Sequence, residues 1–299
     1  MIWVFLALLS ALLLGVYDLF KKSSLNNNAV IPVLFFSTLT SAVIFTPILL
    51  YGFYGNPTKG TLLDFGSIPA KAHLYFFIKS IIVGTSWTLA YFAMKNLPIT
   101  IVSPIRSSGP LWTILGALLI FGEHLSPWQW AGIGVTIFFY YLFGLSGLKE
   151  GISFRTNKWV LFMTLSTVLG SISSLFDKFL VAHYNRLAMQ AWYHIYMIPL
   201  MLGLLLIIWY PNRSKYTPFQ WRWTIPMIGV CLTVADFMYF WSLAHPGALI
   251  AIVSTVRRGS VIVSFSMGAI LFKEKNIKIK ALLLVGILIG IGIIIWAGK

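Results

Sequence analysis

Charged side chains inside long apolar segments are the residues of this chain that could do chemistry. Arg106 and Arg257 each lie well inside such a segment, and Arg258 follows directly. A charge near the centre of a bilayer costs about 2.5 to 3.5 kcal/mol on insertion scales, so a charge found there faces protein or water. Because a guanidinium suits carboxylate or phosphate, substrate binding and structural pairing with an acid are equally favoured for Arg106 and Arg257. Neighbours on a helix point about 100° apart, so we expect Arg258 to face elsewhere.

Acids and lysines in the same segments are the second group of candidates. Asp236 stands among apolar neighbours, and we expect it to pair with one of the arginines; a protonatable coupling site is the alternative. Asp18 and Lys22 are four residues apart on one predicted helix face, which favours an ion pair between them. For Lys22 and Lys178, substrate binding and a solvated position at the helix end are both retained, whereas the solvated position is expected for Lys21.

Aromatic residues make up 16% of the chain, which is more than belts at the membrane interface require. Trp87, Tyr91 and Tyr239 lie inside predicted helices and are the aromatic candidates for substrate binding. Core packing is the competing explanation for each of them. The two tyrosines are the stronger candidates, because a hydroxyl inside the membrane needs a polar partner.

No catalytic or metal-binding motif accompanies these residues. The 5 histidines lack the spacing of a zinc-binding helix, and the chain has neither a phosphate-binding loop nor a nucleophile motif. The single cysteine, Cys231, excludes an internal disulfide. Glu123 and Glu274 follow apolar segments, and we interpret them as helix caps. The sequence therefore predicts that the protein is not an enzyme and binds no cofactor or metal.

The segments that carry the candidates have the length of transmembrane helices. In the whole chain 59% of residues are hydrophobic and 10% are charged, against about a quarter charged in soluble domains. The basic residues are divided among loops and apolar segments, so the net charge of +15 forms no nucleic-acid-binding face. About ten apolar runs approach the roughly 20 residues that a helix needs to cross a bilayer. They cover residues 2–24, 29–51, 73–94, 98–121, 128–146, 158–181, 188–210, 223–244, 248–272 and 277–297.

A repeated pattern indicates that the chain has two related halves. Residues 101–106 (IVSPIR) resemble residues 252–257 (IVSTVR), and the arginines fall on matching positions. Matched arginines are rare in apolar helices, so we infer a duplication. Further matches pair residues 121–123 with 272–274 and residues 19–22 with 175–178.

An odd number of predicted helices in each half places the halves in opposite orientations. Inverted repeats of this kind are an architecture of secondary transporters, which bind substrate near the midplane. We therefore predict an all-α integral membrane protein with ten transmembrane helices, arranged as two inverted five-helix repeats. The first repeat covers 1–147 and the second covers 158–299.

The order and spacing of these features resemble the drug/metabolite transporter superfamily, specifically its EamA-like ten-helix transporters. The residues that carry the resemblance are Trp87, Tyr91, Ala93, Pro98, Ser103, Pro104, Phe121, Gly122, Glu123, Trp128, Gln129, Gly132 and Gly134, with Ala244, Gly247, Ala248, Glu274 and Gly286 in the second half. Lys273 stands where the pattern has a glycine. The resemblance implies a monomeric secondary carrier that exports or exchanges small metabolites across the plasma membrane, with both termini in the cytoplasm.

Cations outnumber acids among the candidates, which favours an amino-acid-like anionic or zwitterionic substrate. Alternating access of the two halves is the expected mechanism. A membrane-embedded enzyme and a non-transporting sensor, each with a small or lipid-linked ligand, are the alternatives. Gly286 and Gly290 permit close packing against another helix or a second subunit, so a dimer is the alternative to a monomer in the bilayer.

The positive-inside rule opposes the orientation that the family resemblance implies. It makes cytoplasmic the side with the basic loops, which is the side opposite the termini. The direction of transport is therefore left open. The basic residues assigned to that side are Lys149, Arg155, Lys158, Arg213, Lys215, Arg222, Lys273, Lys275, Lys278 and Lys280.

Overall fold

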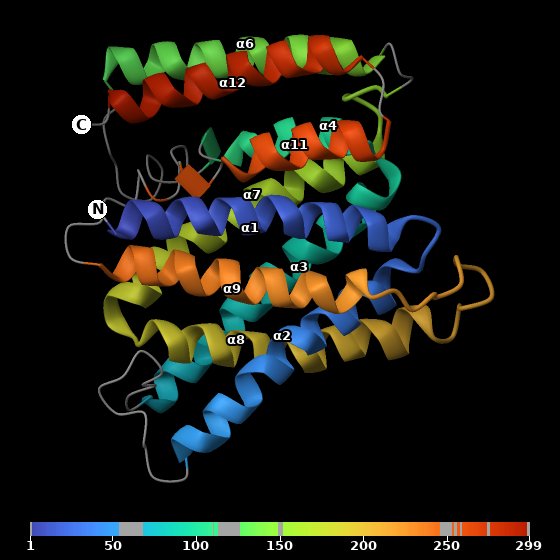
Figure 1. Cartoon of the computed structure of the whole chain (residues 1–299), viewed down its shortest axis with the longest axis vertical. Coiled ribbons are helices and arrows are strands. Elements are labelled where there is room, and N and C mark those ends of the chain that lie inside the picture. The colour runs from blue at the N-terminus through green and yellow to red at the C-terminus, as the bar shows by residue number, and fades with distance from the viewer. Residues whose placement is uncertain are drawn as a thin grey trace.

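The protein is a bundle of helices that run broadly side by side (Figure 1). The computed structural model describes residues 2–53, 68–109, 111–112, 126–148, 152–245, 253, 256–257, 259–273 and 276–297. Every regular element within these ranges is helical, in agreement with the all-α prediction.

The helices begin and end close to the predicted positions. The first half contains α1 (Ile2–Leu25), α2 (Val30–Phe53), α3 (Ala70–Asn96), α4 (Ile99–Ser107) and α6 (Pro127–Leu148). The second half contains α7 (Lys158–His183), α8 (Arg186–Leu204), the π-helical turn η1 (Leu205–Trp209), α9 (Thr224–Ala244), α11 (Ser260–Leu271) and α12 (Ile277–Trp296). Only parts of the predicted helices 98–121 and 248–272 are described, so the ten-helix count and the inverted repeat stay predictions.

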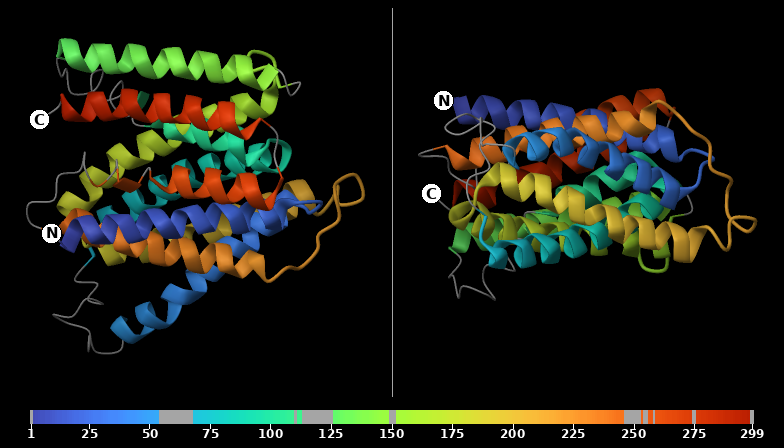
Figure 2. Two further views of the ribbon diagram at one scale, coloured as in Figure 1. Left: turned by 45° about the horizontal axis from the view of Figure 1, so that its top comes forward. Right: turned by 90° about the horizontal axis from the view of Figure 1, so that it is seen from below.

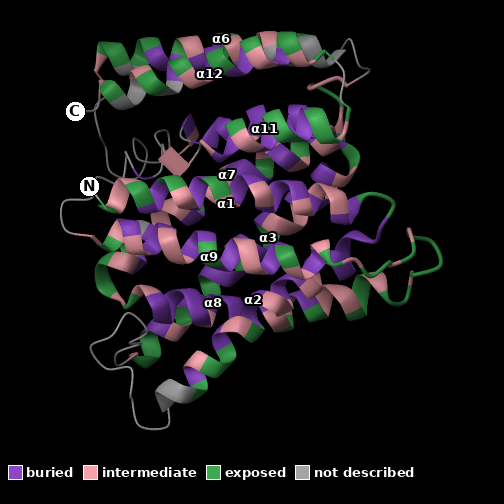
Figure 3. Ribbon diagram, viewed as in Figure 1, coloured by how far each residue is buried: buried purple, intermediate pink, exposed green. Residues whose placement is uncertain are grey.

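Several helices have the length and composition of membrane spans. Within the described ranges six helical stretches are long and apolar enough to cross a bilayer: α1, most of α2, α3, α7, α8 with η1, and α9. Large apolar side chains such as Leu8, Val43 and Leu161 are exposed on these helices, and exposed positions alternate with buried ones along the bundle (Figure 3). Exposed apolar surface of this extent is costly in water and suits lipid, so the protein is a multi-pass membrane protein.

Asparagine side chains begin two helices of the second half. Asn157 accepts a hydrogen bond from the backbone N–H of Trp159 at 2.9 Å, and Asn185 accepts one from Leu187 at 2.9 Å. Both therefore satisfy donors that the first helical turn leaves without a partner. These caps fix where α7 and α8 start, and so which residues of each helix face the bundle interior.

The two halves of the chain pack against each other through α1 on α9, α3 on α7 and α8, and α2 on α8. Serine hydroxyls bridge these contacts. Ser10 of α1 donates to the carbonyl of Ala235 at 2.7 Å, and Ser80 of α3 donates to the carbonyl of Tyr193 at 3.0 Å. Small hydroxyl residues let helix backbones approach closely and add hydrogen bonds where lipid offers none. The interior between the halves is consequently polar as well as tightly packed.

α6 and α12 form a pair at one edge of the bundle (Figures 1 and 2). The face of α12 that carries the small residues Gly286 and Gly290 lies directly against α6. A Cβ atom added at Gly290 would come within 2.4 Å of the Thr136 hydroxyl, and one at Gly286 would come within 2.3 Å of the Phe139 ring. Gly286 and Gly290, considered in the sequence as contacts for a helix or a subunit, are thus used for packing within the chain.

The start of α1 and the end of α12 lie at the same end of the bundle, while the connection 210–223 lies at the opposite end (Figure 1). One residue assigned to the basic loops of that opposite end is placed elsewhere. Lys280 is fully buried in α12, and its ammonium donates to the Thr100 hydroxyl at 2.9 Å. The assignment of Lys280 to a loop was wrong, because the apolar run that begins at Ile277 includes it.

The contact between α6 and α12 predicts unequal effects for two glycine substitutions on one helix. Gly290→Leu will force α12 away from α6, and we expect a loss of roughly 1 to 3 kcal/mol of stability. Gly292 has no atom within 4 Å of an added Cβ, so Gly292→Leu is the matched control and will leave stability nearly unchanged. Thermal unfolding of the detergent-purified variants measures both effects, and equal melting temperatures would contradict the packing.

Candidate functional site

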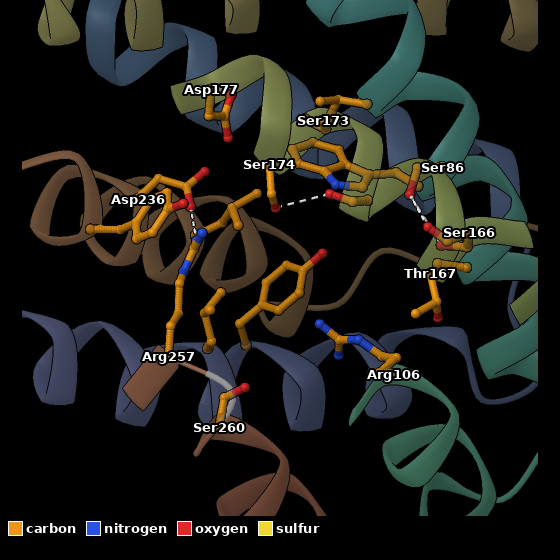
Figure 4. A pocket seen from close by; sticks show the side chains of 18 of the residues that line it. Ser86, Arg106, Ser166, Thr167, Ser173, Ser174, Asp177, Asp236, Arg257 and Ser260 are labelled. Atoms are coloured by element: carbon orange, nitrogen blue, oxygen red, sulfur yellow. Dashed lines mark hydrogen bonds and ion pairs between the residues drawn. The ribbon is translucent and has the colours of Figure 1, made fainter. Parts of the chain in front are cut away.

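A cavity of about 190 Å³ lies in the interior between the two halves of the chain. Its walls come from α1, α3 and α4 of the first half and from α7, α8, α9 and the start of α11 of the second. Figure 4 shows Arg106 and Arg257 on one side of this cavity and Asp177, Ser173 and Ser86 on the other. The volume is large enough for on the order of ten water molecules or one small solute.

Arg106 of α4 pairs with Asp18 of α1 at the margin of the cavity. Asp18 is buried, whereas the Arg106 side chain keeps 23% of its surface accessible, on the cavity side. The expected ion pair between Asp18 and Lys22 is wrong. Although those two residues share a helix face, the Lys22 ammonium donates to the carbonyl of Met94 at 2.8 Å, at the end of α3. Carbonyls at a helix end attract a cation, so a tertiary contact replaces the local pair.

Arg257 pairs with Asp236 of α9, which is the arginine pairing expected for this acid. The Tyr193 hydroxyl donates a second hydrogen bond to Asp236 at 2.8 Å. The Arg257 guanidinium lies 3.9 Å from the centre of the Tyr239 ring, within range of a cation–π interaction. Asp236 therefore accepts hydrogen bonds from two donors, and the ring of Tyr239 contacts its arginine partner.

A third ion pair joins Lys79 of α3 to Asp177 of α7, and it escaped the sequence analysis. Both side chains are more than nine-tenths buried, and both line the cavity. Lys79 satisfied the criterion applied to the arginines, because it lies inside the apolar run 73–94. This pair links the first half of the chain to the second.

Lys21 lies in the interior, where the sequence analysis expected a solvated helix end. It is only 2% exposed and lines the cavity. The expectation was wrong because α1 continues to Leu25 and packs along α9, so its last turns are covered by protein. Lys22, by contrast, is directed to the end of α3 and is not part of the cavity wall.

The aromatic candidates divide between the wall and the layer behind it. Trp87 and Tyr239 line the cavity. Tyr91 is fully buried next to it, and its hydroxyl hydrogen-bonds with Ser37 at 3.1 Å. Tyr91 thus supports the wall through its ring, whereas Tyr193, which was not selected for the site, is part of the wall itself.

Hydroxyl groups form much of the remaining wall, and no sequence pattern distinguishes them from other hydroxyl groups of the chain. Serine and threonine are frequent in membrane helices, where each usually bonds a carbonyl of its own helix, so only the tertiary packing identifies those that face a cavity. Ser86, for example, also donates across the cavity wall to the carbonyl of Ser166 at 2.9 Å. The hydroxyl residues of the wall are Ser86, Ser166, Thr167, Ser173, Ser174 and Ser260.

Four residues considered in the sequence, among them the predicted helix caps Glu123 and Glu274, cannot be placed relative to this site. Arg258, Glu123 and Glu274 lie outside the described residues, as does the side chain of Lys178. Across the described ranges, no three histidine, cysteine, aspartate or glutamate side chains gather as metal ligands. The described site therefore offers fixed charges, hydroxyls and aromatic faces, which can bind a small polar solute.

Comparisons with known proteins give one family and one fold. Residues 1–145 match the sequence profile of the EamA-like transporter family. One solved structure, described only as the crystal structure of a protein, is similar to this chain, with a TM-score of 0.63 and 16% sequence identity. The similarity covers 97% of this chain and 95% of that chain. A comparison with curated proteins found no match. At that identity the structural similarity supports the fold alone.

The buried ion pairs predict that removing one partner of a pair destabilises the protein more than removing both partners. Arg257→Met leaves the Asp236 charge with the Tyr193 hydroxyl alone, and we expect a loss of roughly 3 kcal/mol. Adding Asp236→Asn to that variant removes the uncompensated charge and should recover most of the loss. The measurement is a double-mutant cycle in denaturant unfolding. If the double variant is as unstable as the single one, the ion pair is not what the arginine stabilises.

Proposed function

Because residues 1–145 match the EamA-like transporter family, we propose that this chain carries a small polar solute across the plasma membrane. The solute binds in the cavity between the two halves. The protein acts as a monomer in the bilayer, by export or by exchange.

The observation that carries this proposal is a charged cavity inside an otherwise apolar bundle. Lys21, Lys79, Arg106, Asp177, Asp236 and Arg257 all contribute to its wall. Ionisable residues within membrane helices are costly and mark pathways for substrates or ions. A protein that needed these charges only for helix packing would enclose them completely, whereas here a cavity adjoins each ion pair.

The wall supports a polar and compact solute of about amino-acid size. Ligand pockets for drug-like molecules are lined mainly by apolar side chains and reach 300 to 1,000 Å³ in typical cases. This cavity is smaller and combines ion pairs with a series of hydroxyls. Such a wall can satisfy the hydroxyl, amide and carboxylate groups of an anionic or zwitterionic metabolite.

Alternating access is supported by the origin of the cavity wall. α1, α3 and α4 come from the first half of the chain, and α7, α8 and α9 come from the second. If the halves rock against each other, the site between them opens to each side in turn. The Lys79–Asp177 pair crosses this boundary, so it would be remade or rearranged in each cycle.

If the solute binds in the cavity, a side chain that fills the cavity will stop solute flux without unfolding the protein. Gly170 of α7 lines the cavity, and an added Cβ there meets only the Ser86 hydroxyl, at 3.9 Å. Gly170→Leu therefore places a side chain in the solute's volume, and we expect uptake into proteoliposomes to fall at least about tenfold. The measurement is uptake and counterflow of isotope-labelled amino acids, organic acids, sugar phosphates and nucleosides.

Gly203→Leu on α8 is the matched control, because nothing lies within 4 Å of its added Cβ. It should retain the flux of the unmodified protein. Solute binding without flux in the unmodified protein would favour the non-transporting sensor, and chemical conversion of a solute would favour the membrane enzyme. Equal flux in both leucine variants would place the solute path elsewhere.

A further inference from the structure

Lys21 and Lys22 are adjacent in sequence, but their side chains lie in different environments. Neighbouring side chains on a helix point about 100° apart. Lys22 is therefore directed to the Met94 carbonyl at the end of α3, whereas Lys21 is directed into the cavity wall. With 2% of its surface exposed, Lys21 is as buried as the residues of the hydrophobic core.

The hydrogen-bond and ring partners of the Lys21 ammonium are aromatic and uncharged, and Asp18, the acid that acts on it electrostatically, forms its ion pair with Arg106. Its ammonium donates to the Tyr17 hydroxyl at 3.3 Å and lies 4.2 Å from the centre of the Tyr91 ring. The hydrogen bond between Tyr91 and Ser37 fixes that ring. Aromatic faces attract a cation without neutralising it. Tyr17 and Tyr91 thus hold the ammonium in place and leave its positive charge unmatched.

The charges of the described cavity region do not balance. Each of the acids Asp18, Asp177 and Asp236 is already paired, with Arg106, Lys79 and Arg257 respectively. Lys21 is the additional cation, and no carboxylate among the described residues lies within 4.0 Å of its ammonium. The described site therefore carries one surplus positive charge, and that charge is at Lys21.

We propose that Lys21 is the subsite for the carboxylate of a monoanionic, hydroxyl-bearing solute. This assignment rests on the proposed transport function and names the charge class of its substrate. A monocarboxylate supplies the one negative charge that the site lacks, and the wall hydroxyls suit an uncharged polar body. Arg257, which lines the same cavity, has a buried Nε donor without a hydrogen-bond partner in the described structure.

The same balance disfavours other charge classes. The ammonium of a zwitterion would enter a site whose described acids are all engaged by cations. A dianion, such as a dicarboxylate or a phosphate ester, would bring a second charge that only a broken ion pair could match. Breaking a buried pair leaves an uncompensated charge, which is strongly unfavourable. Selection among small solutes therefore follows the number of charges as well as size.

The test is ligand binding to the purified full chain, with probes that differ in charge and little in size. The panel contains hydroxy monocarboxylates of three to six carbons, each with its neutral amide, its α-amino acid and the dicarboxylate of equal length. We expect a monocarboxylate to raise the melting temperature more than the other three members of its set. If no monocarboxylate exceeds its own amide, the proposal is overturned.

Lys21→Met and Lys22→Met separate the subsite from general effects. Methionine fills the space of the lysine stem without the charge, and removing an unmatched buried charge should not unfold the protein. We expect Lys21→Met to weaken binding of the best monocarboxylate at least about tenfold by isothermal titration, and to leave binding of its amide unchanged. Lys22→Met, outside the cavity wall, should keep the affinity for both. Unchanged monocarboxylate binding in a folded Lys21→Met protein overturns the assignment.

Failure of the subsite and failure of transport give different results. Flux of a neutral or zwitterionic solute that survives Lys21→Met would retain the transporter and reject the monoanion. Lys21-dependent monocarboxylate binding, without flux of any solute in proteoliposomes, would retain the subsite and reject transport.

Discussion

The cost of placing a charge in an apolar interior is the constraint on which this structure depends. Within the described residues, three ion pairs meet that cost at the centre of the bundle, and each joins two different segments of the chain. Asp18 is brought to Arg106, Asp236 to Arg257, and Lys79 to Asp177. A carboxylate without its cation would be far less stable there, so the positions of α1, α3, α4, α7 and α9 are coupled through these side chains.

Two kinds of contact therefore hold the helices together. At the centre, ion pairs and serine hydroxyls link helices around a cavity. At the edge, Gly286 and Gly290 bring α12 into close contact with α6, without an ion pair between the two helices in the described residues. In the proposed transport cycle, the contacts around the solute would rearrange while the contact between α6 and α12 keeps its packing.

Lys21, unlike the other charged residues of the described cavity wall, forms no ion pair with a carboxylate. It therefore makes the net charge of the described wall positive. The rings of Tyr17 and Tyr91 hold its ammonium by attraction to the aromatic face, which requires no counter-charge. A fully balanced cavity would bind neutral and zwitterionic solutes as readily as anions. One unmatched cation supports selection for a single negative charge, within a volume that limits the solute to a small molecule.

The helices and the kinds of residue that line the site could be predicted from the amino-acid sequence. Apolar runs of membrane-spanning length predicted the helix bounds to within a few residues, because the bilayer requires a fixed length of apolar helix. The rarity of buried charge selected Arg106, Arg257, Asp18 and Asp236. Which charges pair depends on the packing of the helices, since partners such as Lys79 and Asp177 are distant in sequence and are joined by the packing of α3 on α7. The fold is therefore needed to assign the pairs. It also distinguished Lys21 from Lys22, because the difference between a cavity wall and a helix end depends on which neighbours cover each face of α1.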